Sequence, residues 1–215
     1  MMKFFFSMLV VLGILLLFLP LLQEKYFDWQ QAKVMDDLKQ LQLDLTKIND
    51  SFEQARLDPN SIDDETEDKE QEGYPHALGV ITIDEIDVQL PILEDATESN
   101  MKVAATHLVE TARIGTEGNA AIAAHRAHKK GRLFNRMGEL EIGDWIKVTL
   151  ADQTHIQYKV DQISVVEPTD LSVLEDPHLG QVLTLITCDP LVNPTHRLII
   201  RAVQVTSEVA QRDLP

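Results

Sequence analysis

The chain opens with an uninterrupted apolar run. Residues 4–22, FFFSMLVVLGILLLFLPLL, contain no charged side chain, and a helix needs roughly 20 such residues to cross the hydrocarbon core of a bilayer. A cleaved signal peptide usually has a shorter apolar core followed by small residues, whereas Gln23, Glu24 and Lys25 follow here. The pattern favours an uncleaved anchor over residues 1–22. Lys3 ahead of the run favours a cytoplasmic N-terminus and an extracellular remainder.

A helical apolar stripe comes next. Six apolar residues follow one another at spacings of 4, 3, 4, 3 and 4, in a segment without Gly or Pro: Val34, Leu38, Leu41, Leu45, Ile48 and Phe52. This rhythm predicts an amphipathic helix over residues 23–57. The stripe is short for a coiled coil, so two interpretations stay open: a helix laid on its own domain, or a helix that binds a partner.

An acidic segment separates this helix from the remainder. Asp58-Pro59-Asn60 is typical of a turn, because Pro59 disfavours helical geometry in the residue before it. Residues 61–72, SIDDETEDKEQE, then carry seven carboxylates against Lys69. We expect residues 58–73 to form a solvated linker or a lid. The segment lacks the spaced ligands and glycine of a known calcium loop, so calcium activation is not indicated.

Short apolar runs separated by turn residues fill the rest of the chain. They indicate strands at GVITI (79–83), VQLPI (88–92), NAAIAA (119–124), WIKVTL (145–150), HIQYKV (155–160), VLTLIT (182–187) and LIIRAVQV (198–205). Only residues 98–105 and 133–137 suggest helices. The spacing predicts an all-β sandwich or closed barrel over residues 74–208.

Charge and cysteine content narrow the function. The 35 acidic against 19 basic residues give a formal net charge of -16, which repels phosphate backbones and disfavours nucleic acid as a partner. Cys188 is the only cysteine of the chain. It therefore cannot form an intramolecular disulfide or a multi-cysteine zinc site.

Cys188 lies where a nucleophile would be useful. It follows the apolar run 182–187 and precedes Asp189-Pro190, so a buried strand delivers it to a loop. A thiol reacts as the thiolate and needs a nearby base or cation. His125 follows the apolar run 119–124, and Arg197 begins another strand nine residues after Cys188. An arginine cannot act as a base, but it can donate hydrogen bonds to an oxyanion.

Other polar residues have simpler explanations. His125 and His128 lack the further ligands that would make a metal site with Cys188, so we expect no metal or other cofactor. Asp189 before Pro190 is typical of a turn. His107 is as consistent with an ordinary loop histidine as with a groove. His196 and Arg197 would point to opposite faces of a strand, and we choose Arg197 for the cleft.

These residues resemble a known family. Thr184-Leu185-Ile186-Thr187-Cys188 is similar to the TLxTC signature of sortases, the cysteine transpeptidases of Gram-positive cell surfaces. His125-Arg126 after an apolar strand and the segment 195–198 around Arg197 resemble the histidine and arginine segments of that family, in the same order. Residues 90–92 and 106–108 also resemble sortase segments, so that the likeness covers about residues 79–205.

The resemblance implies a closed eight-stranded barrel with Cys188 as nucleophile, His125 as acid and base, and Arg197 as stabiliser of substrate and oxyanion. Thr187 would help to hold the sorting peptide. It also implies cleavage of an LPxTG-like motif between Thr and Gly, a thioester on Cys188, and transfer of the acyl group to an amine such as a cell-wall precursor. Surface proteins that bear the motif would be the partners, and the cell membrane the location.

Two alternatives remain at the level of sequence. Pilin-polymerising sortases often carry a lid with an Asp-Pro-aromatic motif and a second membrane segment near the C-terminus. Here Asp58-Pro59 is followed by Asn60, and residues 212–215 are Arg-Asp-Leu-Pro, so we favour a single-anchor protein-sorting enzyme. The other alternative is a non-catalytic bitopic scaffold that binds a partner through the stripe from Val34 to Phe52.

Overall fold

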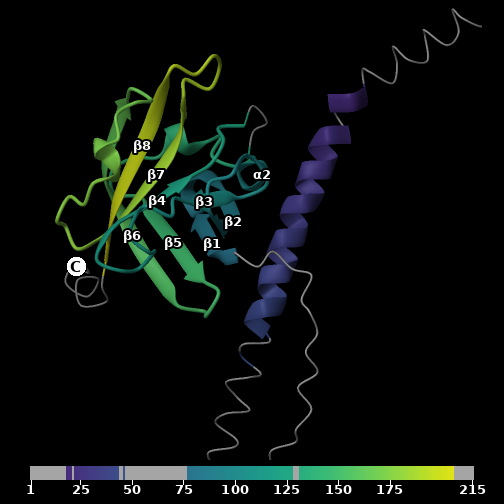
Figure 1. The fold of residues 1–215 in the computed structure, drawn as a ribbon, viewed down its shortest axis with the longest axis horizontal. Helices are drawn as coiled ribbons and strands as arrows, with labels where there is room; N and C mark the ends of the chain where they lie inside the picture. Colours follow the sequence, from purple (N-terminus) through teal and green to yellow (C-terminus); the bar gives the residue numbers. More distant parts are fainter. Residues whose placement is uncertain (1–17, 21, 44–45, 47–76, 128–130, 206–215) are drawn as a thin grey trace, which may run out of the picture.

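The computed structural model describes residues 18–20, 22–43, 46, 77–127 and 131–205 (Figure 1). Within these residues a helix over 22–43 precedes eight strands and one short α-helix, α2 (Glu98–Met101). The strands are β1 (Ala77–Ile83), β2 (Val88–Glu94), β3 (Ala105–His107), β4 (Gly118–Ala123), β5 (Trp145–Leu150), β6 (His155–Val166), β7 (Gln181–Asp189) and β8 (His196–Gln204). Three 3-10 turns connect them: η1 (Asp84–Ile86), η2 (Met137–Glu139) and η3 (Ser172–Leu174).

The strands form a closed barrel in the order β1-β2-β3-β4-β7-β8-β6-β5. Two pairs are parallel, β2 with β3 and β4 with β7, and the other pairs are antiparallel. Parallel strands end at the same edge of a sheet, so β4 and β7 deliver the residues that follow them to one end of the barrel. The sequence prediction of a closed eight-stranded barrel is confirmed.

The barrel encloses its own core. Strand side chains alternate between faces, and the inward residues of β7 and β8 include Leu183, Leu185 and Ile200, all completely buried. The largest buried side chain is Tyr158, whose hydroxyl accepts a hydrogen bond from the Gly115 N–H at 3.1 Å. Burial raises the pKa of this phenol to about 12, because desolvation disfavours the phenolate.

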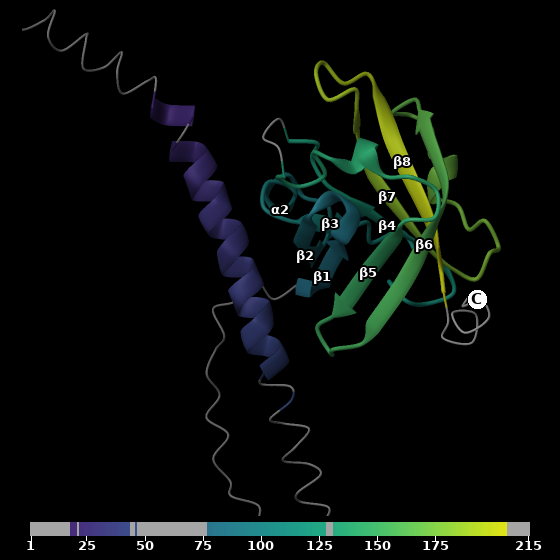
Figure 2. The same ribbon diagram turned by 180° about the vertical axis from the view of Figure 1, so that it is seen from behind.

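The N-terminal helix lies against the outside of the barrel (Figure 2). Val34 is 0% exposed and Leu38 1%, and Val34 belongs to a cluster with Leu93, Val103 and Ala104. The Gln42 side-chain amide donates to the Leu150 carbonyl at 3.3 Å. The first residues of the apolar stripe therefore pack on their own domain, as one of the two sequence interpretations proposed. Leu45, Ile48 and Phe52, the later residues of the stripe, lie outside the described part of the chain.

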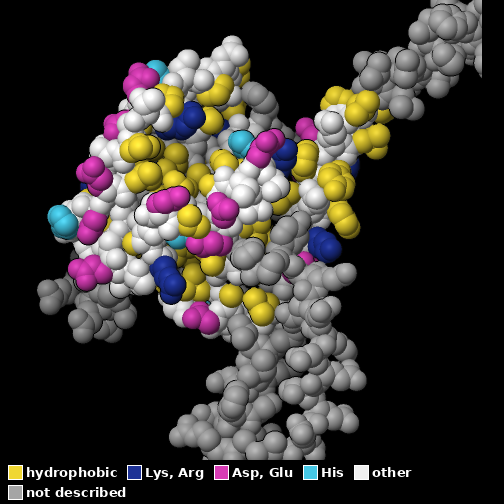
Figure 3. Space-filling model, in the orientation of Figure 1, with side chains coloured by type: hydrophobic (Ala, Val, Ile, Leu, Met, Phe, Trp, Pro, Cys, Tyr) yellow, Lys and Arg dark blue, Asp and Glu magenta, His cyan; other side chains and the backbone are white. Residues whose placement is uncertain are grey.

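The outer side of this helix is apolar near its start. Leu22 is 64% exposed, Tyr26 54% and Trp29 61%, and hydrophobic side chains gather along this part of the helix in Figure 3. The described residues contain no helix both long and apolar enough to span a membrane. The predicted anchor over residues 1–22 lies almost entirely outside the described part, as does the predicted acidic linker over 58–73.

Two local predictions differ from the structure. Residues 133–137 were expected to be helical but form turns that lead into η2, because their buried members, Leu133, Phe134 and Met137, are held by the barrel core rather than by helical periodicity. Residues 98–105 form a helix only as far as Met101. Ala105 then begins β3, a three-residue strand too short to produce a periodic signal in the sequence.

Candidate active site

Three neighbouring strands bring the predicted catalytic residues to one end of the barrel. β4 and β7 run parallel with Ala123 opposite Ile186, and the Ala124 N–H donates to the Ile186 carbonyl at 3.2 Å. His125 therefore follows β4 at the level of Cys188, one residue before the end of β7. On the other side of β7, Cys188 is the register partner of Arg197 in β8. The order His125, Cys188, Arg197 across the barrel wall is thus set by strand pairing.

Alternation places these side chains on the outer face. Leu183, Leu185, Leu198 and Ile200 belong to the barrel core, so Cys188 and Arg197, an odd number of residues away, face outward. Cys188 is partly exposed. A thiol on the outside of a rigid barrel end is accessible to a macromolecular substrate, which a thiol inside the barrel would not be.

His125 lies at the surface of the loop that follows β4. Partial burial lowers its pKa, and the positive charges of Lys102 and Arg132 lower it further, while the carboxylate of Glu98 opposes them. All three causes that lower the pKa disfavour the imidazolium form. The neutral imidazole is therefore the form favoured near neutral pH, and it is the form that can accept a proton from a thiol.

Arg197 is half-buried, and its Nη1 donates to the His196 carbonyl at 3.1 Å. Among the described residues this is the guanidinium's hydrogen bond, so the remaining N–H groups are available to a substrate oxygen. His196 is engaged elsewhere: its Nε2 lies 3.2 Å from Glu167 Oε1, and its Nδ1 lies 2.8 Å from the Thr195 hydroxyl. The choice of Arg197 over His196 agrees with this geometry.

Thr187 is buried, with 2% exposure, and its hydroxyl donates to the Ala124 carbonyl at 2.8 Å. This hydrogen bond ties β7, one residue before Cys188, to the backbone one residue before His125. Direct contact between Thr187 and a peptide stays a prediction. In this structure the side chain links the two strand ends that carry the thiol and the imidazole.

Arg126 is a residue whose place in the site the sequence analysis did not recognise. Its Nη1 donates to the Cys188 carbonyl at 3.3 Å and forms an ion pair with Asp189 Oδ1. Asp189, which the sequence assigned to a turn, therefore has a defined partner. The adjacency of Arg126 to His125 was visible in the sequence, but no local pattern indicated that its side chain crosses to β7.

A shallow pocket of about 170 Å³ continues the outer face beyond the catalytic residues. Its lining includes Thr184 and Ile199, which precede Cys188 and follow Arg197 on the same face, and the β6–β7 connection around Ser172 and Glu175. Asn119 fastens that connection: its side-chain amide donates to the carbonyls of Val173 and Glu175 at 3.0 and 3.1 Å. The pocket therefore lies on the outer face of β7 and β8, at the level of the register partners Thr184 and Arg201.

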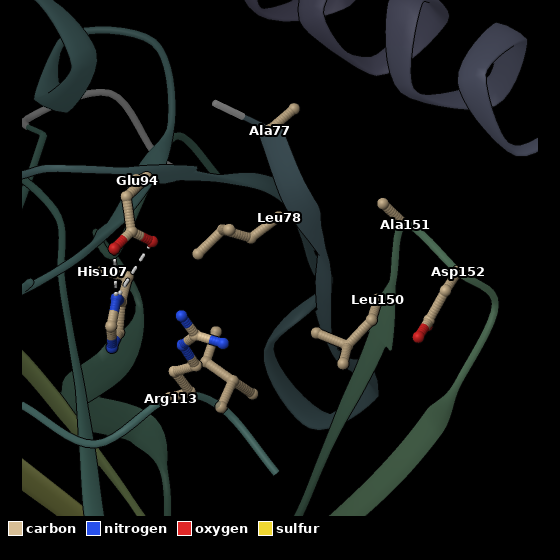
Figure 4. Close-up of a pocket in the computed structure, with 9 residues that line it drawn as sticks. Ala77, Leu78, Glu94, His107, Arg113, Leu150, Ala151 and Asp152 are labelled. Atoms are coloured by element: carbon tan, nitrogen blue, oxygen red, sulfur yellow. Dashed lines mark hydrogen bonds and ion pairs between the residues drawn. The ribbon is translucent and has the colours of Figure 1, made fainter. Parts of the chain in front are cut away.

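His107 belongs to a different part of the barrel (Figure 4). It is buried at the end of β3, with Nδ1 3.1 Å from Glu94 Oε2 and Nε2 2.9 Å from the Ala112 carbonyl. It lines a cavity of about 440 Å³ with Glu94, Arg113 and Leu150. The cavity is lined from the start of β1 and the ends of β2, β3 and β5, and His125 is not among its lining residues. Both ring nitrogens are engaged, which supports leaving His107 out of the catalytic set.

The described residues contain no group of three or more His, Cys, Asp or Glu side chains arranged to hold a metal ion. His128, which the sequence analysis weighed as a ligand, lies outside the described part. This barrel end carries a thiol at the end of β7, a guanidinium at the start of β8 and an imidazole in the loop after β4.

Comparison with known proteins identifies the family to which this closed eight-stranded barrel belongs. A family model, the sortase domain, matches residues 81–205, which is more than half of the chain. The chain belongs to the sortase family.

Relatives of several sortase classes resemble the chain. Sortase A of Bacillus anthracis is 35% identical over 124 residues, covering 57% of each chain. Sortase D of Bacillus subtilis is 28% identical over 133 residues, covering 60% of this chain and 65% of that protein. The solved structure of sortase C1 of GBS Pilus Island 1 has a TM-score of 0.56 at 29% identity, covering 60% of this chain and 64% of that one. The chain thus spans about three fifths of the length of these relatives.

Proposed function

We propose that this sortase-family chain is a membrane-anchored transpeptidase that cleaves an LPxTG-like sorting motif between Thr and Gly and joins the acyl part to an amine. The observation that carries the proposal is the register that places Cys188 between His125 and Arg197 on adjacent strands. A solved Clostridium perfringens structure with 29% identity and a TM-score of 0.55 is described as a sortase D5 transpeptidase. That likeness supports the reaction class.

The reaction begins with the Cys188 thiolate, formed as His125 accepts the thiol proton. The sulfur attacks the threonine carbonyl carbon, and the carbonyl π electrons move to oxygen. Arg197 donates hydrogen bonds to the resulting oxyanion. The C–N bond then breaks, the leaving glycine amine takes the proton held by His125, and a thioester remains on Cys188.

The second half reverses these roles. An incoming amine attacks the thioester carbon, His125 takes the amine proton, and the C–S bond breaks to return the Cys188 thiolate, which recovers the proton from His125. One amide bond is broken and one is formed, so the exchange needs no external energy source or cofactor. Separate acylation and transfer steps give ping-pong kinetics.

The peptide would lie along the outer face of β7 and β8. The pocket on this face is lined by Thr184, Arg201 and the apolar Ile199, which fits an extended peptide with apolar residues ahead of the scissile bond. The partners we propose are surface proteins with such a motif and a cell-wall amine, and the proposed location is the outer face of the cell membrane. We favour protein sorting over pilin polymerisation because Asn60 replaces the aromatic residue of a lid motif.

The scaffold alternative has less support. The partner-binding stripe it requires starts with Val34 and Leu38. Both side chains are buried, and Val34 packs against Leu93 of this chain's own barrel. A partner would have to displace that contact, which makes the stripe a poor docking surface as far as it is described.

Mass spectrometry of the full chain in detergent tests the proposed function. The chain is incubated with an LPxTG-type peptide, with and without an added amine, beside a Cys188→Ala variant. We expect a mass adduct equal to the acyl fragment on the wild type alone, and its conversion to peptide-amine product when amine is added. Product formation by Cys188→Ala at the wild-type rate would exclude the proposed mechanism.

A further inference from the structure

Arg126 joins the two catalytic strand ends through its side chain. The residue follows His125 directly, yet its Nη1 reaches across to the carbonyl oxygen of Cys188, 3.3 Å away, and to the carboxylate of Asp189. Its side chain is 13% exposed and that of Asp189 28%. One guanidinium therefore contacts the backbone of the nucleophile and the side chain of the next residue, from a position adjacent to the histidine.

The surroundings hold this guanidinium in a slot. Arg126 forms an antiparallel bridge with Leu133, and the His125 carbonyl accepts the Phe134 N–H at 3.1 Å, so the backbone of the loop is fixed on both sides of the histidine. A Cβ at Gly138 would lie 2.5 Å from Nη2 of Arg126. The absence of a side chain at Gly138 therefore leaves the space that the guanidinium occupies.

In this slot the terminal nitrogen Nη1 of Arg126 forms hydrogen bonds, whereas Nε forms none within the described part of the chain. Arg126 Nε is buried without a hydrogen-bond partner among the described residues, and an unsatisfied buried N–H destabilises the folded state. In this orientation Nη1 of Arg126 contacts Cys188 and Asp189, while Nε of the same side chain has no hydrogen-bond partner in the residues that the structure describes. Charge-assisted bonds of this kind are roughly twice as strong as neutral ones, which is consistent with the observed arrangement.

We propose that Arg126 is a positioning residue that clamps the end of β7 to the loop after β4, and that its charge neutralises the carboxylate of Asp189, one residue along the strand from Cys188. The clamp has two effects. It keeps the Cys188 backbone at a fixed distance from His125, and it prevents an unpaired carboxylate from disfavouring the neighbouring thiolate. The first effect rests on the proposed function, whereas the second concerns the thiol alone.

A matched pair of variants tests the clamp in the full chain. Arg126→Ala removes it, and Arg136→Ala removes a guanidinium of similar burial from the same connection between β4 and β5. Arg136 is 17% exposed, and its guanidinium pairs with Asp87 and Glu139 rather than with Cys188 or Asp189. Because Cys188 is the only cysteine, the rate of iodoacetamide alkylation at pH 7 reports on this thiol without any peptide substrate.

We expect Arg126→Ala to slow alkylation several-fold, because it removes a positive charge and leaves the Asp189 carboxylate, one residue from Cys188, unpaired. The double variant Arg126→Ala/Asp189→Asn should recover most of that rate, since the carboxylate charge is then absent. Arg136→Ala should alkylate within twofold of the wild type. Equal alkylation rates in Arg126→Ala and Arg136→Ala, or no recovery in the double variant, would overturn the electrostatic part of the proposal.

Peptide kinetics test the positioning part. We expect Arg126→Ala to lower kcat by about tenfold or more with KM within twofold, since small misplacements of reacting groups reduce the rate of chemistry more than binding. Arg126→Lys should recover part of kcat. If Arg136→Ala lowers kcat as much as Arg126→Ala does, the loss reflects general destabilisation, and Arg126 has no specific positioning role. If the wild type itself forms no product, the proposed function fails, and the alkylation comparison still decides whether the clamp exists.

Discussion

Cys188 and Arg197 are register partners across the antiparallel pair of β7 and β8. Both residues lie at the same barrel end, Cys188 one residue before the end of β7 and Arg197 one residue after the start of β8. Their spacing is therefore set by backbone hydrogen bonding rather than by flexible loops. Sites built on strands hold catalytic groups more accurately than sites built on loops.

Arg197 should be needed for the chemical step more than for folding. Its Nη1 contacts the neighbouring His196 carbonyl, and we expect its other donors to serve the oxyanion. Arg197→Ala should lower kcat by about 10²–10³-fold, the loss typical of a removed oxyanion donor, with a small change in melting temperature. Steady-state kinetics with an LPxTG-type peptide and a thermal melt measure both. An unchanged kcat would remove Arg197 from the proposed mechanism.

The pKa of His125 should respond to the two cations near it. Lys102 and Arg132 both lower this pKa, so Lys102→Gln and Arg132→Gln should each raise it toward its ordinary value. Glu98 opposes them, and Glu98→Gln should lower the pKa further. NMR titration of the His125 ring signals, assigned with a His125→Gln variant, checks these directions. A shift of the opposite sign in either cation variant would contradict the electrostatic account.

The same shift gives a pH dependence of stability. Because the pKa of His125 is lower in the folded chain than in the unfolded one, the unfolded state binds more protons between the two values. The contribution of His125 to stability is therefore complete above the unfolded pKa near 6.5 and falls as pH drops toward the folded value. Urea unfolding at pH 5 and pH 7.5 should show this loss in the wild type and a smaller loss in His125→Gln.

The hydroxyl of Thr187 should stabilise the link between the two catalytic strand ends. Thr187→Val keeps the side-chain shape but leaves the Ala124 carbonyl without this donor, so it should cost about 1–2 kcal/mol in the free energy of unfolding. Thr187→Ser retains the hydroxyl and is the matched control. Urea denaturation measures both. A Thr187→Val variant as stable as the wild type would show that the hydrogen bond contributes little.

Docking of the N-terminal helix should depend on Leu38. The side chain is 1% exposed, and Leu→Ala at a buried position typically costs about 2–5 kcal/mol. The loss in the free energy of unfolding should be smaller than this, because the N-terminal helix can separate from the barrel before the barrel unfolds. Leu38→Ala should therefore speed hydrogen exchange in residues 22–43 and leave the barrel strands protected. Leu43→Ala, at a side chain that is 56% exposed, should leave exchange unchanged. Equal effects of the two variants would argue against a specific contact.

The sequence by itself determined most of the strands and the candidate catalytic residues. Alternating and continuous apolar runs such as HIQYKV and VLTLIT follow the strand period directly, because side chains on a strand have only two faces to choose between. Cys188 at the end of such a run already indicated a nucleophile at a strand end. The short β3 and the turns at 133–137 were missed, because segments of that length carry no measurable period.

Only the tertiary structure decided how those residues meet. The parallel pairing of β4 with β7 joins segments 63 residues apart, as Ala123 with Ile186, and no local pattern encodes such a partner. Strand order, closed by long-range hydrogen bonds, placed His125 and Arg197 on either side of Cys188. It also turned Arg126 and Asp189 into an ion pair and packed Val34 on the barrel. Strand register and side-chain burial depend on contacts between segments far apart in the sequence, whereas secondary-structure propensity depends on residues close together in it.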